Sequence, residues 1–256
     1  MITKDFLLDI CPRQLRLPLR FHYWKCRGKL ENEILLLKKL VGKGRRAIDI
    51  GANEGIYSYA LSKLCEVVEV FEPQPWCAEI VTAYSEYRRK NINVYKVGLS
   101  ASKGKLILNI PLVDGKPQSY LATFRDVDCN KISLEVPVNR LDDYDFTDVS
   151  FIKIDVEGHE SNVINGSRKT LLREKPTLLV EIEQRHLGSK PIEAVFNEIA
   201  DLGYEGSFLY KGRLIPLSEF SYNEHQHLWL KNHQFKLDNN KSNSYYVNNF
   251  IFSPSS

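Results

Sequence analysis

The sequence lacks any long apolar run: no stretch of its 256 residues approaches the length needed to span a bilayer. Near its start, Phe6-Leu7-Leu8 is followed at once by Asp9, which does not match the charged, apolar and small-residue regions of a signal peptide. A large excess of one charge is also lacking, and a net charge of +3 does not by itself imply nucleic acid as a partner. We therefore expect a soluble, cytoplasmic protein that binds no nucleic acid.

Cysteine is scarce, and its spacing follows no pattern. The five cysteines are odd in number, are scattered along the chain and match no metal-binding motif. They are expected to be reduced thiols, and no metal site is predicted from them. The remaining composition, 43% hydrophobic and 26% charged, is ordinary for a globular protein, and the length suits one sizeable α/β domain.

One glycine is missing from the most informative stretch, Ala47 to Ser58. A short apolar run passes through Asp49, turns through Gly51 and Gly55, and continues as a helical pattern. Buried parallel strands bring ligands to the start of a helix in this way. The middle glycine of G-x-G-x-x-G is absent, and Glu54 would bring negative charge close to a diphosphate. S-adenosylmethionine has no phosphate and carries two cationic groups, so the turn favours it over a nicotinamide dinucleotide, which remains the alternative.

A second strand with an acid at its end supports an adenosine-containing ligand. Val67 to Phe71 is apolar apart from Glu69, and Glu72 follows about twenty residues after the glycine turn. A carboxylate in that place can accept hydrogen bonds from both ribose hydroxyls. We therefore assign Glu72 to the ribose and Asp49 to the amino-acid end of the cofactor. The alternative for each is a carboxylate that caps a helix or stabilises a turn.

Three further residues complete this set of cofactor contacts. A glycine lets backbone and ligand approach closely and tolerates positive φ, which favours cofactor contact by Gly51 and Gly55. Asn53 either contacts the cofactor or caps the helix that begins near Gly55.

Five motifs follow one another along the chain. They are DIGANEG (Asp49–Gly55), FEP (Phe71–Pro73), LDD (Leu141–Asp143), KIDVEGHE (Lys153–Glu160) and PTLLVEIE (Pro176–Glu183). In this order they resemble the FkbM family of S-adenosylmethionine-dependent methyltransferases, from about Glu31 to Glu183. YVNNFIF (Tyr246–Phe252) is similar to the closing strand of that family.

The resemblance implies both a fold class and an activity. The expected fold is α/β: a Rossmann-like, doubly wound class I methyltransferase sheet of seven mostly parallel strands with a terminal antiparallel hairpin. The expected activity is O-methylation, with S-adenosylmethionine as cofactor, of a hydroxyl on a glycan, a glycosylated metabolite or another natural product. The resemblance predicts neither the individual acceptor nor the oligomeric state.

The first thirty residues differ from the rest of the chain. In segment 1–30 basic side chains alternate with apolar ones, which suits either peripheral contact with an anionic membrane or packing across the cofactor cleft or at a subunit contact. Packing is the favoured interpretation, and Pro12 and Pro18 argue against one continuous amphipathic helix. We expect residues 31–256 to form a single methyltransferase domain.

Two later segments bear on the site. Asn93 to Leu99 is expected to form the third strand, whose end, with Gly98 and Leu99, lies beside the adenine. Residues 103–137 break the α/β rhythm and are expected to add a small β insertion. Its polar loop, which contains Ser119-Tyr120, is a candidate for the acceptor pocket.

Methyl transfer needs a hydroxyl aligned with the methyl group and a residue that takes the hydroxyl proton. Asp155 and Glu157 come at the end of an expected strand from about Ser150 to Val156, where ligands of open α/β sheets collect. If strand geometry continues, both point to one side. Lys153 would share that side, so an internal ion pair is the alternative.

Two histidines lie nearest the expected cleft. Histidine suits proton removal because its pKa lies near neutrality. His186, just past the strand Thr177 to Glu183, is the candidate base. For both His186 and His159 a surface or capping role is the favoured interpretation.

Three other functions remain open at this point. Magnesium held by Asp155, Glu157, Glu183 and one histidine would lower the pKa of an acceptor hydroxyl. A non-catalytic binding module would keep the cofactor pocket alone. The acids at the ends of the expected strands Ser150 to Val156 and Thr177 to Glu183 argue against it. A nicotinamide-dependent oxidoreductase is the third alternative.

Overall fold

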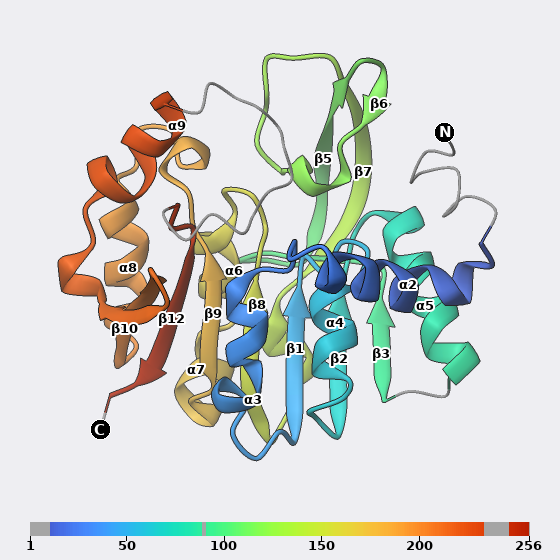
Figure 1. Ribbon diagram of the computed structural model, residues 1–256, viewed down its shortest axis with the longest axis horizontal. Helices are drawn as coiled ribbons and strands as arrows, with labels where there is room; N and C mark the ends of the chain where they lie inside the picture. The colour runs from blue at the N-terminus through green and yellow to red at the C-terminus, as the bar shows by residue number, and fades with distance from the viewer. Residues whose placement is uncertain (1–10, 89–90, 233–245, 256) are drawn as a thin grey trace.

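The computed structural model describes residues 11–88, 91–232 and 246–255. Within these residues an eight-stranded sheet runs through the molecule in the order β11-β10-β12-β9-β8-β1-β2-β3 (Figure 1). Its strands are β1 (Arg46–Ile50), β2 (Val67–Phe71), β3 (Ile92–Tyr95), β8 (Val149–Ile154), β9 (Thr177–Glu181), β10 (Tyr204–Tyr210), β11 (Arg213–Pro216) and β12 (Asn249–Pro254). Strands β9, β8, β1, β2 and β3 run parallel, whereas β12 is antiparallel to both β9 and β10.

This topology confirms the predicted fold class, a Rossmann-like and mostly parallel sheet with an antiparallel hairpin at its end. The described sheet has eight strands where seven were expected, because β11 pairs with the outer edge of β10. The closing strand β12 lies antiparallel between β9 and β10, as the resemblance implied.

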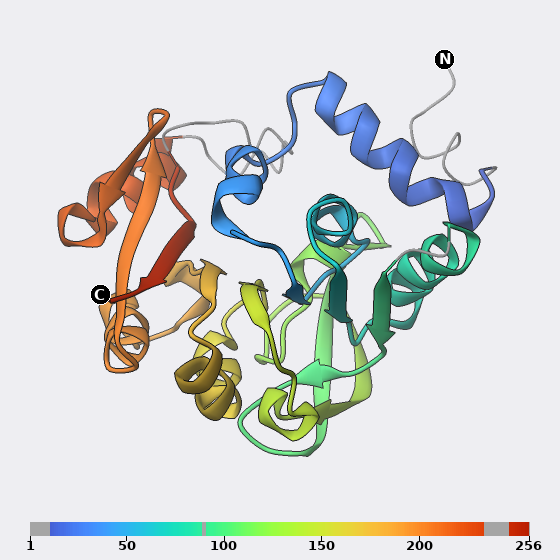
Figure 2. The same ribbon diagram turned by 90° about the horizontal axis from the view of Figure 1, so that it is seen from below.

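Helices cover both faces of the sheet (Figure 2). One face carries α2 (Arg13–Cys26), α3 (Leu37–Leu40), α4 (Ile56–Leu61) and α5 (Pro75–Arg88), and the other carries α6 (Glu160–Gly166), α7 (Arg168–Glu174) and α8 (Ile192–Ala200). Shorter helical segments are η1 (Asn32–Leu36), η3 (Leu141–Tyr144), η4 (Gln184–His186), η5 (Leu217–Glu219), η6 (Asn223–His227) and α9 (Leu228–Asn232). Successive strand residues point to opposite faces of the sheet. Ala47 and Phe151 therefore pack in the core under α2, α3, α4 and α5, and Ile48 and Ile152 pack in the core under α6, α7 and α8.

The register of the three central strands determines where the site forms. Strand β1 pairs with β2 and β8 so that Ile50 lies between Phe71 and Ile154. The three strands therefore end at the same level. The next residues along the chain, Glu72 after β2 and Asp155 after β8, emerge together beside the turn that follows β1.

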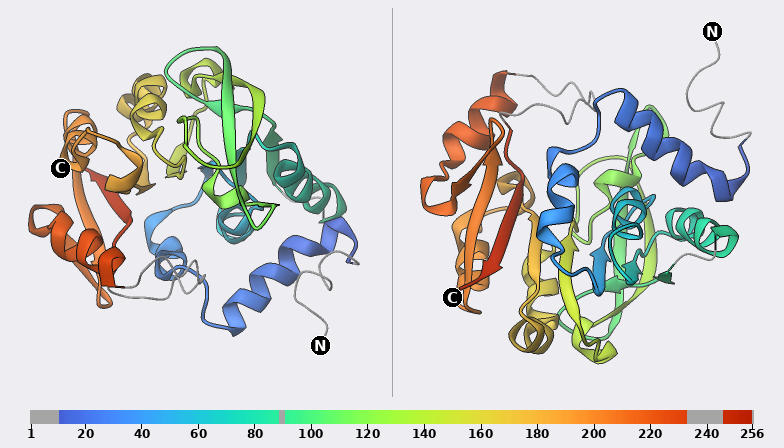
Figure 3. Two further views of the ribbon diagram at one scale, coloured as in Figure 1. Left: turned by 90° about the horizontal axis from the view of Figure 1, so that it is seen from above. Right: turned by 60° about the horizontal axis from the view of Figure 1, so that its bottom comes forward.

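Within the N-terminal segment, Arg13–Cys26 forms one continuous helix, and the prediction that Pro12 and Pro18 would interrupt such a helix was wrong. Pro12 is the N-cap of α2, and Pro18 lies inside the helix. Leu17 and Phe21 are buried in the core shared with α4 and α5, so packing offsets the hydrogen bond that Pro18 cannot donate. The helix passes across the carboxyl end of the sheet (Figures 1 and 3). No helix in the described part of the chain is long and apolar enough to cross a membrane.

A second, smaller sheet stands beyond the carboxyl ends of the first (Figure 1). It contains β4 (Gly98–Leu99), β5 (Gly104–Val113), β6 (Lys116–Pro117) and β7 (Lys131–Asn139) in the order β4-β7-β5-β6, with the turn η2 (Ser119–Leu121) after β6. The expected β insertion is therefore present. The expected third strand was wrong in its second half, because β3 ends at Tyr95 and Gly98–Leu99 pairs with β7 instead.

Candidate active site

A cavity of about 570 Å³ opens at the carboxyl ends of the central strands, between α2, η1 and the β insertion. Eight of the ten site residues predicted from the sequence line it: Asp49, Gly51, Asn53, Glu72, Gly98, Leu99, Asp155 and Glu157. The two that do not are Gly55 and His186. The cavity therefore gathers six of the seven residues assigned to the cofactor and two of the three assigned to the chemistry.

The glycine turn is shaped by close backbone packing. Gly51 has φ +75°, and a Cβ there would lie 1.8 Å from the carbonyl oxygen of Asp155. Only glycine lets the loop after β1 pass this close to the chain after β8. Gly55 has φ +86° and a Cβ there would lie 2.7 Å from Val81 Cγ2 on α5. Gly55 thus packs the turn against its neighbours, and the structure does not place it beside the cavity.

The carboxylate of Glu72 is buried at the end of β2 and is held by two backbone groups. The Asn53 N–H donates to Oε2 at 2.6 Å, and the Gln74 N–H donates to Oε1 at 2.8 Å. Burial raises the pKa of Glu72 to about 7, although these hydrogen bonds oppose the rise. Each carboxylate oxygen can accept more than one hydrogen bond, so both retain acceptor capacity toward the cavity.

Asn53 does not cap the following helix, so that part of the expectation was wrong. The N-cap position of α4 is Gly55, and no side chain caps the helix. Asn53 instead has φ +51° and its side-chain oxygen accepts a hydrogen bond from Cys77 Sγ at 3.3 Å. This conformation turns its backbone N–H toward Glu72.

Asp49 is buried on β1 and lines the cavity from below the glycine turn. It accepts a hydrogen bond from Ser58 Oγ on α4 at 2.5 Å, and burial raises its pKa to about 6. In the register of β1 and β8, its neighbour is Lys153. Asp49 therefore links the strand to the helix and also presents negative charge to the cavity.

Asp155 and Glu157 lie beyond the end of β8, where the strand geometry no longer holds. The strand ends at Ile154, and Glu157 has φ +51°, so the expected alternation does not apply. The internal ion pair is present: Lys153, 1% exposed, places Nζ 3.6 Å from Asp155 Oδ2 and 3.8 Å from Glu181 Oε2. Lys153 also donates to Asn249 Oδ1 at 3.2 Å. Asp155 therefore faces the cavity with a buried cation behind it.

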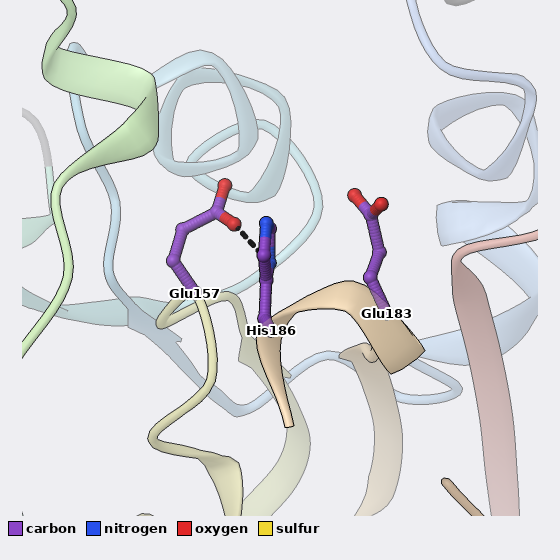
Figure 4. Close-up of side chains that lie close together, drawn as sticks. All are labelled: Glu157, Glu183 and His186. Carbon is purple, nitrogen blue, oxygen red and sulfur yellow. Dashed lines mark ion pairs between the residues drawn. The ribbon is translucent and has the colours of Figure 1, made fainter. Parts of the chain in front are cut away.

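His186 lies behind Glu157 and contacts it directly (Figure 4). Its Nδ1 is 2.6 Å from Glu157 Oε2. Burial lowers the pKa of His186, but the hydrogen bond and charge of Glu157 outweigh it, so the net shift is upward. At Glu157 burial raises the pKa and His186 lowers it; burial is the larger effect, so the net shift is upward. His186 therefore acts on the cavity through Glu157.

Glu183 lies close to Glu157 and His186 (Figure 4), but its hydrogen bonds are to other residues. Arg185 donates to both of its oxygens, at 2.6 and 3.0 Å, and the Tyr246 hydroxyl also donates to it. Burial would raise the pKa of Glu183, but the opposing effect of Arg185 helps to make the net shift downward. The carboxylate therefore stays charged.

The same side chains form two groups, among the described residues, whose spacing would suit a metal ion. One group is Glu157, Glu183 and His186, and the other is Asp155, Glu157 and Glu181; the potential ligand atoms of each lie within 4.8 Å of one another. Glu157 is bonded to His186, Glu183 to Arg185, and Lys153 lies beside the second group. A cation would have to displace or share these contacts.

His159 is a structural residue. It is buried, its Nδ1 accepts from Asn162 Nδ2 at 3.1 Å, and its Nε2 therefore donates to Ser100 Oγ at 2.9 Å. Burial lowers its pKa to about 4, which keeps it neutral at pH 7. It joins the start of α6 to the loop after β4.

Several residues that sequence reasoning missed also line the cavity. They are Arg20 and Trp24 on α2, Glu31 and Glu33 at the start of η1, Gln74 after β2, Arg185 after β9, and Trp229 and Tyr246 in the C-terminal part. Burial, reinforced by the charge of Glu31, raises the pKa of Glu33 to about 7. None of the N- and C-terminal residues follows a parallel strand, so the strand-end rule could not indicate them. Gln74 could have been found, because it lies two positions after Glu72.

Comparison with known proteins agrees with this geometry. The sequence matches the methyltransferase FkbM domain over residues 49–236, more than half of the chain, and matches no curated protein. A crystal structure of a methyltransferase FkbM from Methylobacillus flagellatus KT has a TM-score of 0.50 and 16% identity, covering 82% of this chain and 44% of that one. This chain therefore spans less than half the length of that protein. SMU.1697c from Streptococcus mutans, crystallised with S-adenosylhomocysteine, gives a TM-score of 0.47 and 12% identity over 87% of this chain and 95% of that one.

The donor set of the cavity fits the cationic cofactor. Asp49 and Glu72 offer carboxylates, which suit the ammonium group and the ribose hydroxyls that S-adenosylmethionine carries. The family match leaves no role for the nicotinamide alternative. This protein belongs to the FkbM family of methyltransferases, and S-adenosylmethionine is its cofactor.

Proposed function

We propose that the protein transfers the methyl group of S-adenosylmethionine to a hydroxyl of a glycan or glycosylated metabolite. The observation that carries the proposal is the single cavity in which the cofactor acids, Asp49 and Glu72, lie with Asp155 and Glu157. The cofactor supplies an electrophilic methyl group. The protein must then align the acceptor and remove its proton.

In this proposal the first half of the cavity holds the cofactor. Glu72 accepts hydrogen bonds from the ribose hydroxyls, and Asp49 faces the amino-acid end. Gly51 permits close approach of the backbone, with Asn53 beside it. Gly98 and Leu99 lie along the adenine. Gly55 supports the turn without touching the ligand.

Asp155 is proposed to orient the acceptor hydroxyl and to take its proton. The acceptor oxygen attacks the methyl carbon, the carbon–sulfur bond breaks and its electron pair stays on sulfur. The proton passes to the carboxylate, whose negative charge is balanced by Lys153 at 3.6 Å. Glu157, fixed by His186, offers a second acceptor for a neighbouring hydroxyl.

Two features support a hydroxyl-rich acceptor. Ionised carboxylates accept hydrogen bonds and donate none, so Asp155, Glu157 and Glu181 suit a ligand with several O–H donors. Trp24, Trp229 and Tyr246 line the same cavity and offer flat apolar surfaces with polar edges.

The proposal is tested by incubating the protein with methyl-labelled S-adenosylmethionine and fractionated cell glycans. We expect label in a glycan fraction and a product heavier by one methylene group, in an alkali-stable ether linkage. Label confined to protein, to nucleic acid or to amine groups would contradict the proposal.

Magnesium-assisted transfer is the second candidate, and the grouping of Glu157, Glu183 and His186 is the observation in its favour. Arg185 and Tyr246 already hold Glu183, so the metal-free reaction is preferred. A chelator should therefore leave the rate of methylation unchanged. Loss of activity with chelator, restored by magnesium, would favour the metal-assisted reaction.

A further inference from the structure

Gln74 is a buried polar residue at the edge of the cofactor half of the cavity. It lies between β2 and α5, is 3% exposed and lines the cavity. Its backbone N–H donates to Glu72 Oε1 at 2.8 Å, and its backbone carbonyl accepts from Ala78 N at 3.0 Å. Both backbone groups are therefore fixed: the N–H by the carboxylate of Glu72, and the carbonyl by the first turn of α5.

The orientation of its side chain is also determined. Gln74 Nε2 lies 3.0 Å from the backbone carbonyl oxygen of Ser119 in η2. A carbonyl only accepts hydrogen bonds, so the amide group must face Ser119 and the side-chain oxygen must point elsewhere.

That oxygen accepts no hydrogen bond from the described part of the chain. Among residues 11–88, 91–232 and 246–255, Gln74 Oε1 has no hydrogen-bond donor within reach. A buried acceptor without a partner is unfavourable, and buried polar groups are nearly always satisfied by protein, water or ligand. An oriented acceptor beside a ribose-binding carboxylate is therefore suited to a ligand donor.

We propose that Gln74 Oε1 accepts a hydrogen bond from a ribose hydroxyl of the cofactor, and that Gln74 thereby couples cofactor binding to the η2 turn. The proposal rests on the assignment of S-adenosylmethionine to this cavity. One amide then links the cofactor to the η2 turn: its oxygen accepts from the cofactor, and its nitrogen donates to the carbonyl of Ser119. Ser119 is next to Tyr120 and Leu121, which line the cavity. Cofactor binding orders the wall against which the acceptor packs.

The first test is calorimetric titration of S-adenosylhomocysteine into the parent and Gln74→Met. Methionine keeps the volume of glutamine and removes both polar atoms. The loss of one neutral hydrogen bond should weaken binding by roughly three- to tenfold. Gln118→Met is the matched control, because Gln118 lines the same cavity but its amide donates to Lys116 O at 3.0 Å within the insertion. Equal affinity of Gln74→Met and the parent would overturn the proposal.

The ribose assignment is tested with the 2′-deoxy and 3′-deoxy forms of the same ligand. If Gln74 contacts one of these hydroxyls, Gln74→Met should cost little further affinity toward the analogue that lacks it. Full additivity with both analogues would overturn the ribose contact. If Gln74→Met does not fold, Gln74→Asn, whose shorter amide cannot reach both Ser119 and the ligand, replaces it with the same expectation.

The coupling is tested by hydrogen–deuterium exchange of the peptide around residues 118–124. S-adenosylhomocysteine should protect this peptide in the parent and protect it much less in Gln74→Met at equal saturation. Equal protection in both would overturn the coupling. A parent protein that does not bind S-adenosylhomocysteine at all would instead contradict the assignment of the cofactor to this cavity.

Discussion

At the scale of single residues, the site depends on buried carboxylates whose charge is costly. Asp49, Glu72 and Glu33 all have a raised pKa, and burial is the largest cause at each. In the proposed binding mode, the cofactor brings positive charge and hydroxyl donors to these groups. We expect the cavity to be adapted to the bound state at the expense of the stability of the cofactor-free protein.

Glu72→Gln should therefore change how stability depends on pH. The pKa of Glu72 is raised from 4.5 to about 7, so the folded state binds the proton more tightly than the unfolded state does. The contribution of Glu72 is thus most favourable below pH 4.5 and is lost as pH rises to about 7. Glutamine removes this dependence, so the variant should gain stability relative to the parent across that window, by up to about 3 kcal/mol.

Urea unfolding of cofactor-free protein at several pH values measures this effect. Buried acids that do not interact with Glu72 titrate alike in both proteins and cancel in the difference, whereas Asp49 is coupled to Glu72 by charge and contributes to it. Glu193→Gln, at an exposed acid on α8, is the matched control. A difference between Glu72→Gln and the parent that does not vary with pH would show that the carboxylate is not strained by burial.

Asp155→Asn should slow the chemical step. The substitution keeps size and shape but removes the charge and the basic oxygen. Single-turnover methylation is expected to fall by roughly 10²–10⁴-fold, with a much smaller change in affinity for S-adenosylhomocysteine. The fold should persist, since Lys153 keeps Glu181 and Asn249 as partners.

The exposed Asp201→Asn controls for general loss of acidic charge, because it does not line the cavity. If Asp155→Asn retains a rate within about threefold of the parent, its role is not chemical. Glu157 and the histidine behind it would then be the next pair to substitute.

At the scale of elements, the β insertion separates two tasks. The Ser119 hydroxyl accepts from Trp76 Nε1 at 3.0 Å, whereas the Ser119 carbonyl accepts from Gln74. Replacing Ser119 and Tyr120 by alanine removes side chains from the acceptor wall but leaves the backbone link intact. The apparent KM for the acceptor should rise while cofactor affinity stays nearly constant. Equal loss of both would place the turn in the cofactor site or the core.

Elements near the site differ in how well the sequence predicted them. Strands β1, β2, β8 and β9 are short, mostly apolar runs between turn residues, and a local pattern suffices for them. Helix α2 was not predictable in this way, because only the burial of Leu17 and Phe21 compensates for Pro18. The end of β3 was missed since Gly98–Leu99 changes its pairing partner, which no local pattern records.

At the scale of the whole molecule, the strand-end rule placed the predicted acids at the cavity. Asp49, Glu72 and Asp155 were predictable because they lie at or just after the ends of parallel strands of equal register. Glu31, Trp229 and Tyr246 come from distant parts of the chain, so no local pattern indicated that they line the same cavity. Sequence reasoning therefore predicted the lining beside the strand ends more completely than the lining from the N- and C-terminal parts of the chain.

Cofactor binding should stabilise the whole fold, because the cavity joins elements from both halves of the described chain. A ligand that binds only the folded state adds RT ln(1 + [L]/Kd), about 2.7 kcal/mol at a hundredfold excess over Kd. S-adenosylhomocysteine should thus raise the midpoint of thermal unfolding. NAD should not raise this midpoint. The turn lacks the middle glycine that a diphosphate would need, and it carries the acid Glu54, which is paired with Arg20. Stabilisation by NAD at equal concentration would contradict the assignment of this turn to a sulfonium cofactor, whereas stabilisation by neither would show that the acids of the cavity do not bind adenosine.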